Sequence, residues 1–428
     1  MCSSDLYQQT LDYLYANLPM YQRVGAVAYK EDLTNTILLC EALGNPQHRF
    51  KSIHVAGTNG KGSSSHMLAA ILQSEGYKTG LYTSPHLKEF TERIKINGQE
   101  VSQEFVIDFV NRIKPSIEKI LPSFFEITVA MAFDYFAQQK VDVAVIEVGL
   151  GGRLDSTNVI TPLVSLITNI SWDHKEILGD TLQKIAYEKA GIIKSGIPVV
   201  ISERQSEVDF VFDKKAADVS SEIIFASDHY KIIDRSDGDF LVETKGIKTS
   251  YNLDLKGSYQ RKNLAGLLAT VAILRDKGIA VSGESLKMGL SSTILLTGLK
   301  GRWQKLSIKP LIVCDTGHNE AGIQEVLLQI LKQQFSKLYI VWGMVKDKDI
   351  TNILKLLPKE ASYFFCQAKI PRAIPAHELA VKANEFGLSG IVVNDVNDAI
   401  TKAKEMSSES DMIFIGGSTF VVAEIEGL

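Results

Sequence analysis

The sequence predicts an α/β protein of two domains, each with a mostly parallel sheet covered by helices. Short apolar, β-branched runs alternate with helix-like stretches almost from end to end. Continuous runs of this kind are typical of strands that are buried on both faces. The length of 428 residues also exceeds what a single hydrophobic core usually serves, so we expect two domains.

The first part of the chain supplies most of the expected elements. Amphipathic segments such as 63–75 and 105–121 separate the strand candidates. A more polar region, about 203–252, predicts a hairpin or small subsheet, and a helix at about 260–277 follows it. The expected strands are residues 53–55, 79–82, 143–148, 163–168 and 198–202.

A second α/β domain is expected after the segment 297–302, which has the composition of a connection between domains. The predicted domains are therefore 1–297 and 298–428, and the second falls within the usual size range of a domain. Its expected strands are residues 311–314, 338–342, 362–366, 390–393 and 412–415.

Composition limits the classes of partner. A net charge of -4 and a pI near 6.1 do not favour binding to nucleic acid or to an anionic membrane. No apolar run approaches the roughly 20 residues that span a bilayer, and the first residues do not resemble a secretory signal. The cysteines lack paired spacing, so we expect reduced, mostly buried thiols in a cytoplasmic protein: Cys2, Cys40, Cys314 and Cys366.

A glycine-rich turn between a strand and a helix, residues 53–63, predicts a phosphate-binding loop. Lys61 can reach the outer phosphates of a nucleotide, and Ser63 can meet a magnesium ion. The strict pattern G-x-x-x-x-G-K-[ST] is not met, because Val55 and Gly62 stand where a glycine and a hydroxyl belong. An ordinary glycine-rich turn therefore remains the alternative.

Polar residues follow several predicted strands, where α/β sheets place their ligands. Ser84, Glu147 and His174 together offer the oxygen and imidazole ligands of a magnesium site. A strand-end acid satisfied by a neighbouring lysine or backbone, and a structural histidine, are the alternatives. Lys189 lies on the apolar face of a helix, and spacing alone favours a packed stem with the ammonium in solvent.

The second domain has two comparable strand-to-helix segments. In residues 314–319, Asp315 and His318 could reach a ligand lodged between the domains. Residues 343–349 favour a charged, solvated loop when they are taken alone.

Together these segments resemble the folylpolyglutamate synthase family, which includes bifunctional dihydrofolate synthases and belongs with the Mur ligases. The modified phosphate loop is the form that this family uses. The matching segments, which occur in the family's order along nearly the whole chain, are 54–63, 82–87, 92–94, 125–126, 146–155, 173–174, 189–192, 301–302, 347–349, 371–373 and 416–418.

The resemblance implies a P-loop-type ATPase domain with a mostly parallel sheet, followed by a smaller Rossmann-like ligase domain. It also implies a role for each matching residue. The residues implied for ATP are Thr58, Asn59, Gly60, Lys61, Gly62, Ser63, Asn263, Arg302 and Asp315, and those for Mg²⁺ are Ser84, Glu147 and His174. The residues implied for the pterin are Ser123, Phe124, Phe125, Glu126, Leu154, Asp155 and Ser156. The residues implied for catalysis are Lys61, His174, Lys189, Asp315 and His318.

Two further implications concern particular residues. Lys189 matches the lysine that the family carboxylates to a carbamate, which reverses the interpretation drawn from its spacing. The chain also departs from the family, which usually has Asp-Gly-Ala-His-Asn-Pro at 315–320 and a proline in place of Lys300.

The implied reaction is an ATP-dependent ligation. ATP would phosphorylate the carboxylate of dihydropteroate or of a folate's terminal glutamate, and L-glutamate would displace the phosphate; a monomer is expected. A Mur-type ligase acting on a cell-wall precursor is the main alternative, and the pterin-pocket segments argue against it. A GTPase-like switch should show an Asn-Lys-x-Asp motif, and a non-enzymatic nucleotide-binding module would not need Glu147, His174 and Lys189 together.

Overall fold

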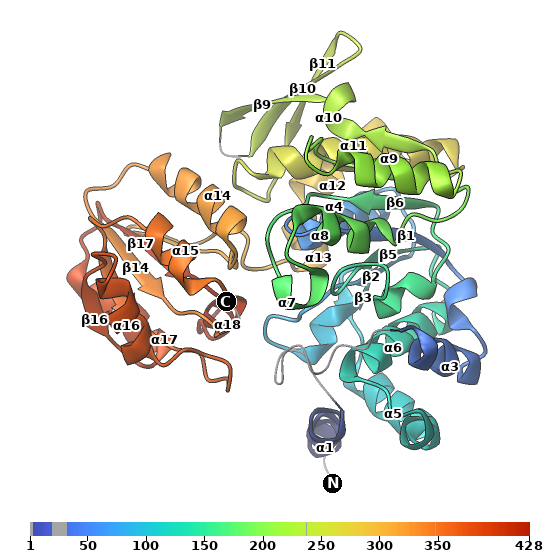
Figure 1. Cartoon of the computed structure of the whole chain (residues 1–428), viewed down its shortest axis with the longest axis horizontal. Helices are drawn as coiled ribbons and strands as arrows, with labels where there is room; N and C mark the ends of the chain where they lie inside the picture. The colour runs from blue at the N-terminus through green and yellow to red at the C-terminus, as the bar shows by residue number, and fades with distance from the viewer. Residues whose placement is uncertain (1–2, 19–31, 237, 347) are drawn as a thin grey trace. The chain divides into compact units, whose positions relative to one another are not determined.

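The computed structural model describes residues 3–18, 32–236, 238–346 and 348–428 (Figure 1). The chain divides into two compact units. The first comprises Met1–Asp254 and Gln260–Gly298, and the second comprises Leu255–Tyr259 and Leu299–Leu428. Both units contain a mostly parallel sheet with helices, so the predicted α/β class is confirmed. Cys2, Asp237 and Asp347, which belong to segments discussed above, lie outside the described residues.

The first unit is built on a sheet with the strand order β4-β3-β2-β5-β1-β6-β7-β8 among the described residues. Strands β2, β5, β1, β6, β7 and β8 run parallel. Strands β3 and β4 add antiparallel pairs at one edge. The strands are β1 (Lys51–Ala56), β2 (Thr79–Tyr82), β3 (Ile94–Ile96), β4 (Gln99–Glu100), β5 (Val143–Glu147), β6 (Val164–Ile167), β7 (Val199–Ile201) and β8 (Ile223–Phe225).

Helices cover both faces of this sheet, as a parallel sheet requires. One face packs on α4 and α11, and the other on α6 near β2 and on α8 and α9 near β7. The helices of the first unit are α1 (Ser3–Asn17), α3 (Thr34–Ala42), α4 (Lys61–Ser74), α5 (Gln103–Ile120), α6 (Phe124–Gln138), α7 (Lys175–Leu178), α8 (Leu182–Ala190), α9 (Asp209–Asp218), α10 (Ala226–His229), α11 (Gln260–Asp276), α12 (Gly283–Ser291) and α13 (Thr293–Thr297).

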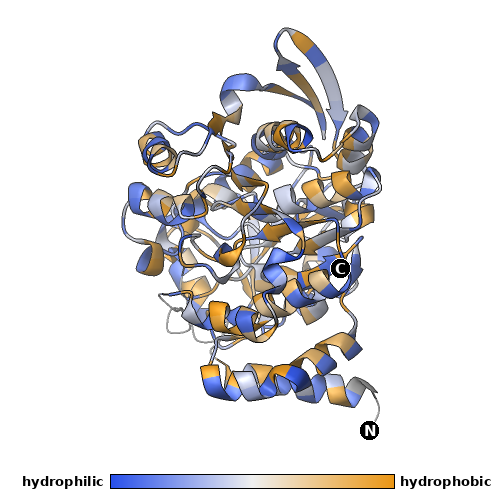
Figure 2. Cartoon of the chain, turned by 90° about the vertical axis from the view of Figure 1, so that its right-hand side faces the viewer, coloured by the Kyte–Doolittle hydropathy of each residue, from blue (hydrophilic) through white to orange (hydrophobic). Residues whose placement is uncertain are grey.

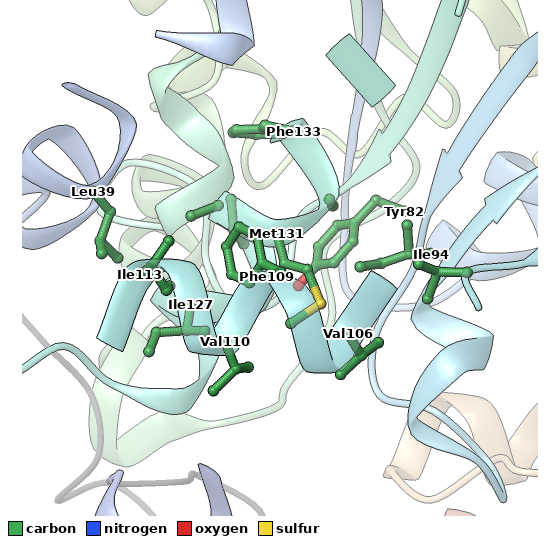
Figure 3. Packing of buried hydrophobic residues seen from close by; sticks show 14 of the residues in the cluster. Leu39, Tyr82, Ile94, Val106, Phe109, Val110, Ile113, Ile127, Met131 and Phe133 are labelled. Carbon is green, nitrogen blue, oxygen red and sulfur yellow. The ribbon is translucent and has the colours of Figure 1, made fainter. Parts of the chain in front are cut away.

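A large core of this unit forms around α5 and α6. Apolar residues of α5 recur with a helical period, and Val106, Phe109, Val110 and Ile113 are buried. Figure 2 shows apolar and polar residues alternating around the helices, which is the pattern of elements with one buried face. In Figure 3 these side chains meet Tyr82 of β2 and residues of α6. The core therefore fixes the end of β2, which leads to Ser84.

The polar region after β7 differs from its prediction in part. An antiparallel sheet of β9 (Lys231–Ser236), β10 (Asp239–Thr244) and β11 (Ile247–Asn252) is present, which confirms a small subsheet. Residues 209–225 instead form α9 and β8, which continue the main alternation. The prediction was wrong there because β8 is only three residues long and follows a charged helix.

The end of the first unit is held by buried polar contacts. Thr297, the last residue of α13, is fully buried, and its carbonyl oxygen accepts a hydrogen bond from Lys95 Nζ over 3.0 Å. Its hydroxyl lies 2.8 Å from His66 Nδ1 on α4, the helix that begins at the phosphate loop. The chain is therefore anchored up to the residue before Gly298, where the first unit ends.

The second unit has the strand order β12-β13-β17-β14-β15-β16 in its described part. Strand β12 is an antiparallel edge and the others are parallel. The elements are β12 (Gln304–Ile308), β13 (Leu311–Cys314), α14 (Glu320–Leu331), β14 (Leu338–Trp342), α15 (Ile350–Leu356), β15 (Ser362–Phe365), α16 (Ala376–Asn384), β16 (Gly390–Val392), α17 (Val396–Met406), β17 (Met412–Gly416) and α18 (Thr419–Ala423).

All ten predicted strands are present, with ends that differ by no more than two residues. The sequence prediction missed β3, β4 and β12, which are two to five residues long and have no continuous apolar run to mark them. Cys40, Cys314 and Cys366 are buried and free of disulfides, as expected. Among the described residues, no helix is both long enough and apolar enough to cross a membrane.

Candidate nucleotide and metal site

The phosphate loop between β1 and α4 depends on two glycines. Gly57 and Gly60 have φ angles of 143° and 88°, which side-chain-bearing residues rarely adopt. Space is also absent, because a Cβ on Gly57 would lie 1.8 Å from the hydroxyl oxygen of Thr168 and one on Gly60 would lie 2.1 Å from Asn263 Oδ1. Asn263, on α11, thus borders the loop as predicted for an ATP-site residue.

The loop is fixed by the segment that follows β6. The N–H of Thr58 donates to the carbonyl oxygen of Asn169 over 2.9 Å, and the N–H of Asn59 donates to Asn169 Oδ1 over 3.0 Å. The Thr58 hydroxyl exchanges two hydrogen bonds with the main chain of Ser171, and the Thr168 hydroxyl donates to the carbonyl of Asn59. The main-chain N–H groups of Thr58 and Asn59 are therefore bonded within the protein. Helix α4 begins two residues later, at Lys61.

Gln205, which follows β7, fixes this segment in turn. Its side-chain amide donates to the carbonyl of Ile170 and accepts from the N–H of the same residue, each over 2.8 Å. The segment 168–171 is thus held between the phosphate loop and the β7 loop. Sequence reasoning missed the roles of Asn169 and Gln205, because only the adjacency of β1, β6 and β7 brings them to these positions.

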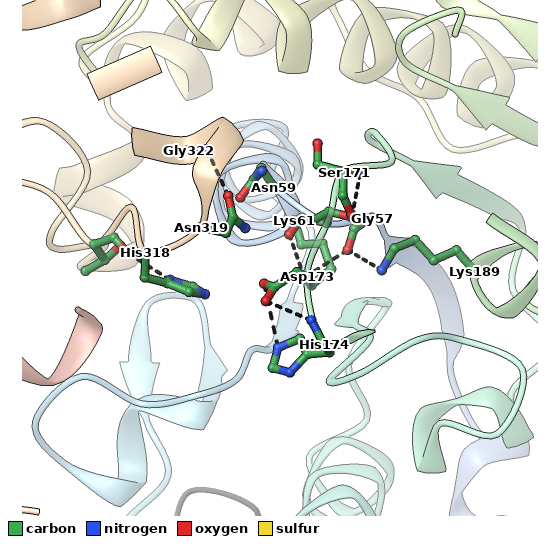
Figure 4. A network of polar contacts seen from close by, with 12 residues as sticks. Gly57, Asn59, Lys61, Ser171, Asp173, His174, Lys189, His318, Asn319 and Gly322 are labelled. Atoms are coloured by element: carbon green, nitrogen blue, oxygen red, sulfur yellow. Dashed lines mark hydrogen bonds and ion pairs between the residues drawn. The ribbon is translucent and has the colours of Figure 1, made fainter. Parts of the chain in front are cut away.

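Two lysines converge on one carbonyl oxygen of the phosphate loop. Lys61 Nζ and Lys189 Nζ each donate to the oxygen of Gly57 over 3.0 Å, and Lys61 also donates to the carbonyl of Thr58 (Figure 4). The interpretation of Lys189 as a solvent-facing lysine was wrong, because the residue is only 4% exposed. Burial, together with the charge of Lys61, lowers the pKa of Lys189 to about 7. At neutral pH, Lys189 is therefore an uncharged amine in a large fraction of the molecules.

The predicted magnesium ligands follow neighbouring strands. Glu147 ends β5, is 4% exposed, and accepts a hydrogen bond from the N–H of Ser84 over 3.2 Å. His174 lies after β6 with a φ of 49°, and its Nε2 is 3.7 Å from a carboxylate oxygen of Asp173. Ser84 and Glu147 lie at the carboxyl ends of the adjacent strands β2 and β5, and His174 follows β6, which is separated from β5 by β1.

The donor set suits a hard cation only in part. The described residues contain no group of three or more His, Cys, Asp and Glu side chains that could hold a metal. Magnesium usually keeps several waters and takes few protein ligands besides substrate phosphates. A buried carboxylate beside a serine and near a phosphate loop fits that behaviour, so the residues are compatible with magnesium that binds together with a nucleotide. Asp173 was not predicted as a site residue, although it adjoins His174 in the sequence.

The residues predicted to line a pterin pocket have structural contacts of their own. Ser123 and Glu126 form a capping box at the start of α6. Phe124 is buried, with the guanidinium of Arg93 stacked over its ring. Phe125 abuts Gly149, where a Cβ would lie 2.3 Å from the ring.

The second predicted group, Leu154, Asp155 and Ser156, lies in the loop that begins at Gly149. Asp155 is buried, and its carboxylate accepts hydrogen bonds from the N–H groups of Leu150 and Thr157. Phe125 of the first group thus contacts Gly149, where the loop that leads to the second group begins.

The second unit has its own buried polar group after β13. Asp315 accepts hydrogen bonds from the Tyr259 hydroxyl over 2.9 Å and from the N–H of Trp303 over 2.7 Å. Burial raises the pKa of this carboxyl group, against the opposing effect of Arg302. Tyr259, which sequence reasoning missed, belongs to the short segment that joins this unit from before α11.

Arg302 and His318 contact the same turn. The Arg302 guanidinium donates to the Thr316 hydroxyl, and His318 Nδ1 lies 3.0 Å from the carbonyl oxygen of Thr316. Asn319 caps α14 by accepting from the N–H of Gly322 (Figure 4). The helix thus has an asparagine cap, and Glu320 takes the first helical position, where the family usually has a proline.

Comparisons with known proteins match this arrangement. The Mur ligase middle domain matches residues 55–272, and the Mur ligase glutamate ligase domain matches residues 301–419. The dihydrofolate synthase/folylpolyglutamate synthase of Bacillus subtilis (strain 168) is 34% identical over 439 residues, which cover 98% of each chain.

Two solved structures extend the comparison. Escherichia coli FolC in complex with DHPP and ADP has a TM-score of 0.87 at 27% identity, covering 99% of this chain and 97% of that chain. The bifunctional folylpolyglutamate synthase/dihydrofolate synthase of Yersinia pestis, complexed with AMPPNP and Mn ion, has a TM-score of 0.83 at 29% identity, covering 99% and 98%.

The buried amine of Lys189 predicts a pH dependence of stability. Between about pH 7 and 10.5 the unfolded chain binds a proton on this lysine that the folded chain does not. The stability of the wild type relative to Lys189→Met should therefore rise with pH in this window, by up to about 1.4 kcal/mol per pH unit. Urea unfolding in CO₂-free buffer measures the difference.

Lys184→Met is the matched control, because Lys184 is an exposed lysine of the same helix. Its stability difference from the wild type should stay nearly flat over the same window. A flat difference for Lys189→Met as well would contradict the assignment of a depressed pKa to Lys189.

Proposed function

Because this chain belongs to the folylpolyglutamate synthase/dihydrofolate synthase family of the Mur ligases, we propose that it is an ATP-dependent ligase of folate metabolism. It would join L-glutamate to dihydropteroate, to the γ-carboxylate of folate polyglutamates, or to both. The convergence of Lys61 and Lys189 on the Gly57 carbonyl carries the proposal. Lys61 would contact phosphates, and Lys189 is a buried amine that a simple nucleotide-binding module would not need.

The reaction would proceed in two displacements. A carboxylate oxygen of the folate substrate attacks the γ-phosphorus of ATP, the bond to the bridging oxygen breaks, and ADP leaves. The amine of L-glutamate then attacks the acyl carbon, phosphate leaves with the former carboxylate oxygen, and the nitrogen loses its proton to form the amide. Several anions meet in the first step, so it needs fixed positive charge.

The protein would supply that charge at the phosphate loop. Lys61 would leave the carbonyls of Gly57 and Thr58 to contact the outer phosphates. The first turn of α4, from Lys61 to Ser63, would bind phosphate oxygens through its N–H groups and the helix dipole. Asn263, Arg302 and Asp315 are proposed to complete the ATP site, and His318 to act near the reacting groups.

Ser84, Glu147 and His174 would hold Mg²⁺, which would neutralise charge on the phosphates. The Mn ion in the Yersinia pestis relative supports a divalent cation. Lys189 is proposed to carry a carbamate, formed when its neutral amine adds to CO₂ and releases one proton. The lowered pKa of Lys189 supports this step, because only the uncharged amine is nucleophilic.

Ser123, Phe124, Phe125 and Glu126, with Leu154, Asp155 and Ser156, are proposed to border the pterin. The DHPP bound to the Escherichia coli relative supports a pterin substrate. A Mur-type ligase for a cell-wall precursor is less favoured, because the relative matched along 98% of each chain is named for folate substrates. A monomer and a cytoplasmic location complete the proposal.

The substrate assignment predicts glutamate-dependent release of ADP. With purified protein, ATP and Mg²⁺, we expect ADP release with 7,8-dihydropteroate and, in a separate assay, with tetrahydrofolate, each only when L-glutamate is present. Release with tetrahydrofolate alone would make the protein a tail-extending enzyme. No release with either substrate would overturn the folate assignment.

The carbamate proposal predicts chemical rescue of a lysine variant. Lys189→Ala should lose most turnover, about 100-fold or more, and regain part of it when short carboxylic acids such as acetate are added. The anionic oxygen of the acid would replace the carbamate oxygen in the space left by the side chain. Lys184→Ala should keep wild-type turnover and gain nothing from acetate. Full turnover of Lys189→Ala without additive would show that no carbamate is needed.

A further inference from the structure

We propose that His54 is a positioning residue for recognition of the folate substrate. Through the Thr157 hydroxyl it would set the carboxylate of Asp155, and with it the loop from Gly149 to Ser156. We call the connection His54–Thr157–Asp155 the relay. The inference rests on the proposed function, because it takes this loop as a wall of the pterin site.

The hydrogen bonds of the relay have a fixed direction. Thr157 Oγ donates its single hydrogen to Asp155 Oδ1, which also accepts the N–H of Thr157 over 3.0 Å. The hydroxyl therefore has only lone pairs left for His54 Nε2, which lies 2.9 Å away. His54 must then donate from Nε2 to the hydroxyl oxygen.

The relay is buried along its length. His54 and Thr157 are fully buried and Asp155 is 3% exposed. Burial and the nearby charge of Lys194 lower the pKa of His54 to about 3, so the imidazole is neutral at any working pH. A neutral donor polarises the Thr157 hydroxyl toward Asp155 without placing a second charge in the core.

The other imidazole nitrogen shows what His54 supplies. His54 Nδ1 is buried and has no hydrogen-bond partner among the described residues. An unpaired buried acceptor is a cost that a leucine of similar volume would avoid. A histidine is therefore useful at this position because its Nε2–H donates a hydrogen bond to the Thr157 hydroxyl.

Asp155 transmits the constraint to the loop. Its second oxygen accepts the N–H of Leu150 over 2.8 Å, so one carboxylate joins both ends of the segment 150–157. This loop begins two residues after Glu147, and Phe125 abuts it at Gly149. A change in the orientation of the carboxylate would move the loop that carries Leu154 and Ser156.

The relay is separate from the contacts that hold the phosphate loop. His54 lies on β1 opposite Ile146 of β5, and its side chain reaches the loop after β5. The main chain of Thr58 and Asn59 is held instead by Asn169, after β6. Loss of the relay should therefore weaken use of the folate substrate and leave use of ATP nearly unchanged.

A double-mutant cycle tests the relay in the full-length protein. Thr157→Val removes the hydroxyl with little change of shape and should raise the KM for tetrahydrofolate or dihydropteroate about tenfold. His54→Leu should raise it about threefold or more, and the double variant should match Thr157→Val because both changes break one connection. Thr157→Ser keeps the hydroxyl and should stay within about twofold of wild type, as should the KM for ATP in every variant.

Hydrogen exchange gives a second readout that does not need turnover. Amides of residues 149–157 should exchange faster in Thr157→Val than in Thr157→Ser, with unchanged exchange at 57–63. Additive effects in the cycle, an equal rise in the KM for ATP, or unchanged exchange in Thr157→Val would each overturn the relay. A wild type that turns over neither folate substrate would overturn the proposed function, and the exchange result would still decide the relay. Thr157→Val is nearly isosteric and carries the test if His54→Leu does not fold.

Discussion

The attachment of the phosphate loop to the segment after β6 is the constraint on which the candidate site depends. Asn169 accepts the N–H groups of both Thr58 and Asn59, and these bonds fix the path of the loop. The close approach of Gly57 to Thr168 follows from this path and excludes any side chain at Gly57. Because these donors are engaged internally, the proposed phosphate contacts are Lys61 and the first turn of α4.

The same path explains the chemistry around the loop. The Gly57 carbonyl accepts hydrogen bonds from two lysines. Burial, together with the charge of Lys61, lowers the pKa of Lys189, so part of this lysine is uncharged at neutral pH. The parallel sheet adds the remaining groups, because β2, β5, β1 and β6 end at one edge and deliver Ser84, Glu147 and His174 there. In the proposed ligase reaction these groups would contact phosphates, hold Mg²⁺ and, at Lys189, carry a carbamate.

Much of the fold and part of the site followed from the sequence. Long apolar runs such as β14 were predicted to the residue because burial on both faces leaves a continuous pattern, whereas β3 and β12 lack it. Glu147 was proposed as a ligand because an acid in an apolar run is unusual. The role of Asn169 was not predicted, because it depends on which strands are neighbours in the sheet. Spacing did not predict the burial of the Lys189 ammonium, because helical periodicity places the stem of a lysine but not its charged end.

Affinity for ADP in Asn169→Ala is the most direct test of this account. The change removes the acceptor of the Asn59 N–H and leaves the carbonyl bond to Thr58 in place. Isothermal titration calorimetry with Mg²⁺ should show a Kd about tenfold weaker than wild type, equivalent to about 1.4 kcal/mol, with only a small change in Tm. A Kd equal to that of the wild type would contradict the claim that this attachment shapes the phosphate site.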